Sequence, residues 1–164
     1  MTSLPPAAVF AAALAQAESQ PQAGFSALHA YADALVGAKI FTVLAFDFDR
    51  QEMRRLFTSD PVLYPAGAVD RLGDSVWERT LIGAKKPLVL NDYEALSSLL
   101  TEAAELRQKG AEAMLNLPVV VAGAVLGALN MLHDSGRYTP ERVAQAQALV
   151  PGAAALLLGT RSPG

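Results

Sequence analysis

The feature that most constrains the fold is a pair of apolar segments in the last third of the chain. Residues 115–121 and 125–132 are rich in Val, Leu and Ala, and three small residues separate them. This pattern predicts two antiparallel strands joined by a tight turn. Thr139 and Pro140 then mark the start of a helix that runs to about residue 158, because a threonine hydroxyl accepts a hydrogen bond from a free helix amide and proline has no amide to satisfy. We therefore expect a buried hairpin covered by the final helix.

The composition limits the classes of function that the chain can have. At 164 residues it is long enough for one domain with its own core. A net charge of -3 provides no positive field to attract a polyanion, so we expect no nucleic-acid partner. The chain contains no cysteine, which excludes disulfides, thiolate nucleophiles and thiolate-bound metals. Arg54-Arg55 and Lys85-Lys86 are interpreted as solvated positions at a strand edge or a turn.

Two apolar stretches have the length of targeting segments but lack other features that such segments need. Residues 4–17 could be mistaken for a secretory signal, yet no lysine or arginine precedes Lys39. Residues 115–132 are interrupted by Pro118, Gly123 and Gly127, whereas a membrane span needs about 20 apolar residues. We therefore expect a cytoplasmic protein without a membrane segment.

Apolar periodicity, caps and turn residues predict the remaining elements. They are helices over 5–19 and 25–36, strands over 39–48 and 52–58, a long loop over 59–74, a short helix over 75–83, a strand over 87–91 and a helix over 93–109. The first strand is apolar in both registers, which predicts a central strand buried on both faces. The second strand is more polar and is expected to be an outer strand.

Several motifs, in their order and spacing, resemble the GAF domain family, and in particular small standalone bacterial GAF proteins. The motifs are Phe41-Thr42-Val43-Leu44, Tyr64-Pro65, Asp74-Ser75-Val76-Trp77, Lys86-Pro87-Leu88-Val89, Leu115-Asn116-Leu117-Pro118-Val119 and residues 126–133. The resemblance implies an α+β fold of the PAS/GAF type. Its antiparallel sheet has five or six strands, with the N- and C-terminal helices on one face and a cavity under loops and short helices on the other. It also implies one domain over residues 1–164, with an N-terminal helix over 1–20 and the GAF core over 22–158.

The resemblance also shows which GAF subclasses the chain does not match. Members that reduce free methionine sulfoxide carry paired reactive cysteines, and bilin-binding members need an attachment cysteine; this chain has neither. The signature of the cyclic-nucleotide phosphodiesterase members is not recognisable. In the standalone relatives we expect a cysteine near residues 110–112, where this sequence has Ala111. We therefore expect no cofactor.

Polar residues within the apolar strands are the first candidates for a ligand site. Asn116 and Asn130 need partners because an unpaired buried amide is costly. Those partners are either a ligand or each other and nearby backbone. His133 lies at a predicted strand end beside Asp134, where it either contacts a ligand or makes a structural hydrogen bond to the following loop.

Aromatic and loop residues complete the candidate set. Tyr64 and Trp77 either form a cavity wall or anchor the long loop to the sheet. Asn91 and Tyr93 flank the point where a strand gives way to a helix, with Asp92 as the expected N-cap. His29, on the second helix, is expected to face solvent or an interface.

Three functions follow from these observations. The preferred hypothesis is a non-enzymatic sensor of an unknown small organic ligand, acting as a homodimer without an effector domain of its own. The dimer is expected to form through the N- and C-terminal helices, because the second half of the last helix is apolar nearly all round and needs burial on more than one side. The alternative is a dimerisation or protein-interaction module with a filled pocket. The least favoured hypothesis is an enzyme that uses His133.

Overall fold

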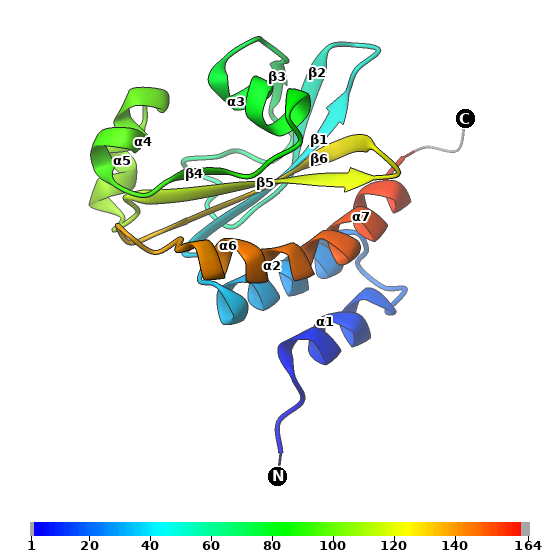
Figure 1. Ribbon diagram of the computed structural model, residues 1–164. Coiled ribbons are helices and arrows are strands. Elements are labelled where there is room, and N and C mark those ends of the chain that lie inside the picture. Colours follow the sequence, from blue (N-terminus) through cyan, green and yellow to red (C-terminus); the bar gives the residue numbers. More distant parts are fainter. Residues whose placement is uncertain (1, 162–164) are drawn as a thin grey trace.

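An open antiparallel sheet of six strands organises the structure, a computed structural model in which residues 2–161 are described (Figure 1). The strands are β1 (Ile40–Asp47), β2 (Glu52–Thr58), β3 (Val69–Arg71), β4 (Leu88–Leu90), β5 (Ala113–Val121) and β6 (Ala124–His133). Their order across the sheet is β3-β2-β1-β6-β5-β4. The α+β fold and the antiparallel sheet predicted from the sequence are therefore confirmed.

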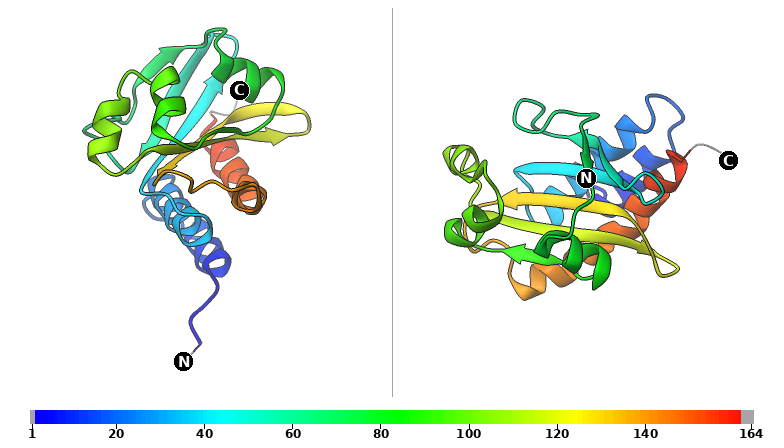
Figure 2. Two further views of the ribbon diagram at one scale, coloured as in Figure 1. Left: turned by 60° about the vertical axis from the view of Figure 1, so that its left-hand side comes forward. Right: turned by 90° about the horizontal axis from the view of Figure 1, so that it is seen from above.

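Helices cover both faces of the sheet, in sets that differ in length. The helices are α1 (Pro6–Leu14), α2 (Gln22–Leu35), α3 (Val76–Glu78), α4 (Tyr93–Leu99), α5 (Ala103–Gln108), α6 (Pro140–Ala146) and α7 (Val150–Gly159). In Figure 1, α2, α6 and α7 lie along one face, while α3, α4 and α5 lie over the other. Figure 2 shows α1 packed on the far side of α2, away from the sheet. In the part of the chain that the structure describes, no helix is long and apolar enough to cross a membrane.

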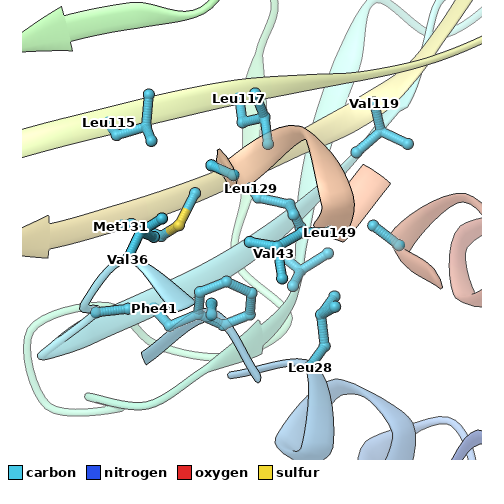
Figure 3. Packing of buried hydrophobic residues seen from close by; sticks show 14 of the residues in the cluster. Leu28, Val36, Phe41, Val43, Leu115, Leu117, Val119, Leu129, Met131 and Leu149 are labelled. Atoms are coloured by element: carbon cyan, nitrogen blue, oxygen red, sulfur yellow. The ribbon is translucent and has the colours of Figure 1, made fainter. Parts of the chain in front are cut away.

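The two faces of the sheet are separated by the alternation of side chains along the strands. Odd-numbered residues of β1 and β5, and of β6 from Gly127 onward, point toward α2 and the C-terminal helices; Phe41, Leu117 and Leu129 are examples from the main hydrophobic core (Figure 3). Even-numbered residues such as Thr42 and Asn116 therefore point to the opposite face, under the short helices.

The hairpin and the central strand agree with the sequence prediction. β1 pairs with both β2 and β6, and almost all of its residues are buried. The turn between β5 and β6 has two residues, because Val121 pairs directly with Ala124. Ala122 and Gly123 have φ angles of 49° and 79°, and positive angles at both central positions match the right-handed twist of a two-residue hairpin.

The prediction that β2 is the outer strand is wrong. Residues 52–54 of β2 pair with β3, which lies inside the segment that was expected to be a loop without secondary structure. All three residues of β3 are exposed, so its sequence lacks the apolar alternation that reveals longer strands.

Several predicted helices differ in their extent from those observed. The helix expected over 93–109 is divided into α4 and α5 by Leu100, whose backbone is extended. The first helix ends at Leu14, and the side chain of Gln20 donates to the carbonyl of Ala13 over 3.0 Å beyond that end. The last helix is interrupted by a turn of 3₁₀ helix over Gln147–Leu149, which places Pro151 in the first turn of α7, where its missing amide costs no hydrogen bond.

Candidate functional site

A cavity of about 270 Å³ lies on the face of the sheet opposite the long helices. Its floor consists of even-numbered residues of β1, β5 and β6 together with Met53 and Arg55 of β2. The segment that contains Tyr64, the short helix α3 and the junction between α4 and α5 form its walls and cover. The lining combines apolar side chains with polar and charged ones, and a concave site of this kind can take a small organic molecule.

A row of three polar side chains crosses the floor of the cavity. The Nδ2 of Asn116 donates to the Oδ1 of Asn130 over 2.6 Å, and the Nδ2 of Asn130 donates to the Oγ1 of Thr42 over 2.9 Å. The three residues are direct neighbours in the register of β5, β6 and β1. Asn116 is only 1% exposed, and its Oδ1 accepts no hydrogen bond from any described residue. The row therefore ends in a buried, unpaired acceptor that belongs to a residue of the cavity floor.

A second polar chain forms one wall. The guanidinium of Arg55 lies over the ring of Tyr64, 5.1 Å from its centroid, and the Nη1 of Arg55 donates to the carbonyl of Pro65. The hydroxyl of Tyr64 donates to the Oε1 of Glu102 over 2.9 Å. Burial, and then the negative charge of Glu102, raise the pKa of Tyr64, so this hydroxyl keeps its proton and remains a donor.

Trp77 reaches the cavity from the short helix α3, which is fixed by its N-terminus. Ser75 and Glu78 form the predicted capping box, in which the Ser75 Oγ accepts from the amide of Trp77 and the Glu78 carboxylate accepts from the amide of Ser75. The indole packs edge-on against Phe46 at 5.9 Å between ring centroids. Two independent contacts thus hold the single tryptophan of the chain beside the cavity.

The structure brings four of the seven residues proposed from the sequence to this cavity: Tyr64, Trp77, Asn116 and Asn130. Asn91, Tyr93 and His133 lie outside it. The amide of Asn91 exchanges two hydrogen bonds of 3.0 Å with the backbone of Tyr138 and so fastens the loop before α6. Tyr93 stacks under the guanidinium of Arg107, at 4.4 Å.

His133 occupies the last position of β6, on the face of the sheet that carries the long helices. Its Nδ1 accepts a hydrogen bond of 2.8 Å from the amide of Asp134, which corresponds to the structural alternative considered for this residue. Partial burial, and then the charge of Arg137, lower the pKa of His133, so the ring is neutral near pH 7. Asp134 forms an ion pair with Lys39 through its Oδ1, and its Oδ2 lies 3.6 Å from the His133 Nδ1.

Sequence reasoning missed several polar residues of the cavity, among them Thr42, Arg55 and Glu102. Thr42 is a lone hydroxyl within an apolar strand, and its even position matches Asn116 and Asn130, a signal that was present but unused. Glu102 lies at the break between α4 and α5, which was not predicted. Arg55 was expected to be solvated, but it is half-buried and lines the cavity, whereas its neighbour Arg54 is exposed as expected.

His29 was also misplaced by the sequence prediction. It is half-buried, its Nε2 lies 2.8 Å from the carbonyl of Ala38, and its ring stacks on Phe41 with the centroids 5.3 Å apart. Its position on the second helix faces the sheet, so it belongs to the core. Within residues 2–161, no group of three or more His, Asp or Glu side chains is arranged to hold a metal ion.

Comparisons with known proteins identify relatives of this fold. A family model described as the GAF domain matches residues 13–157. The GAF domain of a phosphoenolpyruvate-protein phosphotransferase from Coxiella burnetii has a TM-score of 0.69 at 16% identity and covers 95% of this chain and 94% of that chain. The second GAF domain of DevS from Mycobacterium smegmatis has a TM-score of 0.57 at 18% identity, with coverages of 95% and 96%.

A third similar structure is the GAF domain of a two-component sensor histidine kinase from Bacillus halodurans. It has a TM-score of 0.63 at 11% identity and covers 80% of this chain and 90% of that chain. A search of curated proteins found no significant match. At these identities the structural neighbours establish the fold, and the family match establishes membership.

Proposed function

The chain belongs to the GAF domain family, and from this premise we propose that it is a non-enzymatic sensor that binds a small organic molecule in the cavity described above. One observation carries the proposal: the Oδ1 of Asn116 is buried at the cavity floor without a donor. Leaving a buried acceptor unpaired costs roughly 1 to 3 kcal/mol, and a bound ligand with an N–H or O–H group removes that cost. The cavity volume of about 270 Å³ suits a small ligand rather than a large chromophore.

The segments that cover the cavity suggest how binding produces a signal. Tyr64, Trp77 and the junction between α4 and α5 come from three separate loops, and each contributes to the wall. A ligand that contacts all three stabilises one arrangement of these loops, because any molecule that binds only the ordered state shifts the population toward it. The similar domain from Bacillus halodurans is part of a protein named as a sensor kinase, which is consistent with a signalling role.

Association into a homodimer through the terminal helices is a second candidate function. Its support is α1, an uncharged helix in which Val9 is 51% exposed and of which only Phe10 is buried. Leu4, just before α1, and Leu158 on α7 are exposed as well, at 66% and 47%. An enzyme using His133 has less support, because His133 and the cavity lie on opposite faces of the sheet.

The proposal can be tested with reporters that the sequence already provides. Met53 and Met114 line the cavity, whereas Met131 is buried on the helix side of the sheet and serves as an internal control. The protein is labelled with ¹³C at the methionine methyl groups and titrated with the small-molecule fraction of an extract of its host cells. We expect the Met53 and Met114 resonances to shift, the Met131 resonance to stay, and the Trp77 fluorescence to change.

The same experiment can contradict the proposal. Unchanged spectra at saturating extract, combined with no retained small molecule in native mass spectra of the purified protein, would rule out sensing by this cavity. Shifts restricted to Met131 would point to a site on the helix side instead.

A further inference from the structure

The position of Arg55 depends on an irregularity in the pairing of β1 and β2. Val43 pairs with Phe57 and Leu44 pairs with Arg55, so Leu56 is an extra residue in β2, a β-bulge. Leu56 and Phe57 both pack against the helix-side core, and Arg55 remains on the cavity side. In a regular ladder Leu56 would face Leu44, and Arg55 would pair with Ala45 and point to the other face. The bulge therefore directs a cation into the cavity.

This cation has unused binding capacity. Within residues 2–161, Arg55 has no ion-pair partner, and its Nε is buried without an acceptor. The guanidinium is held in place by Tyr64 and by the carbonyl of Pro65, so it is already oriented. An oriented and partly desolvated guanidinium is the group that best binds a carboxylate, because the hydrogen bond is charge-assisted.

The remaining charges limit how much negative charge the ligand carries. Asp70, Glu78 and Glu102 also line the cavity. The oxygens of Glu78 accept from the amides of Gly73 and Ser75, and Glu102 accepts from Tyr64. Within residues 2–161 neither carboxylate forms an ion pair with Arg55. Three carboxylates around one cation repel a polyanion such as a nucleotide phosphate, whereas a single negative charge directed at Arg55 is tolerated.

The two unpaired atoms, the Nε of Arg55 and the Oδ1 of Asn116, belong to strands that are not neighbours in the sheet. Arg55 and Asn116 lie on β2 and β5, three strand spacings apart in the sheet, or about 14 Å between their backbones at roughly 4.8 Å per spacing. Neither atom satisfies the other, since both lack a partner. Apolar side chains of Leu44, Met114 and Trp77 line the same cavity. A ligand that forms hydrogen bonds with both atoms therefore needs an apolar body between its two polar groups.

We infer that the ligand is a small organic monocarboxylate whose carboxylate accepts from the Nε of Arg55 and whose far end carries an N–H or O–H group that donates to the Oδ1 of Asn116. This inference depends on the proposed sensing function and specifies its ligand class. It accounts for both buried unpaired side-chain atoms found in the described structure. It also assigns a role to Arg55, a residue with no apparent function in the sequence.

Two matched sets of compounds test the ligand class by isothermal titration calorimetry, with Trp77 fluorescence as a second readout. The first set is para-hydroxyphenylacetate, phenylacetate and para-hydroxyphenylacetamide. The second set is omega-hydroxyhexanoate, hexanoate and omega-hydroxyhexanamide, so that the shape of the body does not decide the result. In a set that binds, we expect the hydroxy acid to bind about tenfold or more tightly than either partner compound. The compound without the hydroxyl lacks the hydrogen bond to Asn116, and the amide replaces the charge-assisted hydrogen bond to Arg55 with a weaker neutral one.

Substitutions assign each preference to a residue. Arg55→Gln is expected to abolish the preference for the acid over the amide, and Asn116→Leu is expected to abolish the preference for the hydroxyl. Arg54→Gln is the matched control, because it removes the same charge from the adjacent residue of β2. Arg54 faces away from the cavity. If Arg55→Gln does not fold, Arg55→Lys retains the charge without the guanidinium and is expected to weaken the preference for the acid.

The outcomes separate this inference from the proposed function. Equal binding of acid and amide to the wild-type protein would overturn the monocarboxylate while leaving sensing intact. The same holds if extract shifts Met53 and Met114 but neither compound set binds at millimolar concentration. If the extract causes no spectral shift and neither compound set binds, both the sensing function and the ligand class are overturned.

Discussion

Asn130 and His133 illustrate how the position of a single residue determines its role. They are three residues apart on β6, so they point to opposite faces of the sheet. Asn130 lines the cavity, whereas His133 lies against the backbone near Gly37, where a Cβ added to that glycine would lie 2.9 Å from the His133 ring. From the sequence, both residues were proposed for one ligand site. Their odd spacing along the strand is enough to place them on opposite faces of the sheet.

At the residue scale, the lowered pKa of His133 predicts a dependence of stability on pH. The unfolded chain binds a proton below the ordinary imidazole pKa of about 6.5, whereas the folded chain does so only at lower pH. The contribution of His133 to the free energy of unfolding is therefore fully present above about pH 6.5 and decreases as the pH falls toward the pKa of the folded state. We expect His133→Gln to lose less stability than wild type between about pH 7.5 and about pH 5.5, measured by urea unfolding. Identical losses in the two proteins would contradict this prediction.

At the scale of elements, the contact between β1 and β6 depends on a glycine. Gly127 pairs with Ala45, and an added Cβ would lie 2.0 Å from the carbonyl oxygen of Leu44. Backbone atoms of a central strand cannot move away without breaking the ladder. We expect Gly127→Ala to lower the free energy of unfolding by about 2 to 3 kcal/mol, the upper part of the range for overpacking, in urea titrations.

Gly159→Ala is the control for this substitution. Gly159 ends α7 and has no neighbouring atom within 4 Å of an added Cβ. Its replacement is expected to change the free energy of unfolding by less than about 1 kcal/mol and in the stabilising direction, because alanine favours the helix. A comparable loss in both variants would show that the steric argument for Gly127 is wrong.

Irregularities within two elements explain why parts of the cavity were not predicted from the sequence. The bulge at Leu56 arises from the pairing of β1 with β2, and the break at Leu100 places Leu99 and Glu102, from the two sides of the break, along the same cavity. Neither position carries a Gly or Pro that would mark an irregularity in the sequence. Arg55 and Glu102 reach the cavity as a consequence of these irregularities, so local patterns could not identify them.

At the scale of the whole molecule, the exposed apolar surface of α1 predicts self-association. If two copies pair through the terminal helices, Val9→Glu places a charge in the interface and shifts the protein from dimer to monomer in sedimentation experiments. Its stability as a monomer is expected to change little, because Val9 is 51% exposed. Val62→Glu makes the same change at a valine that is 89% exposed outside the helices and is expected to leave the dimer intact. A monomeric wild type, or a dimeric Val9→Glu, would contradict the interface.

The sequence by itself determined most of the elements, and its resemblance to GAF domains implied their arrangement in layers. Continuous apolar runs located β1, β5 and β6, the capping residues located α3 and α6, and the polar residues Asn116 and Asn130 stood out within apolar strands. These signals are local, because side-chain periodicity and caps depend on residues a few positions apart.

The tertiary structure alone decided which of these residues share a site. Thr42, Asn130 and Asn116 meet because three strands align in register, and Arg55 joins them because one strand contains an extra residue. His133 is excluded because it points to the opposite face of the sheet, and Asn91 is excluded because its amide bonds to the backbone of Tyr138. Register between distant strands is set by packing and pairing over the whole sheet, so no short segment of sequence contains it.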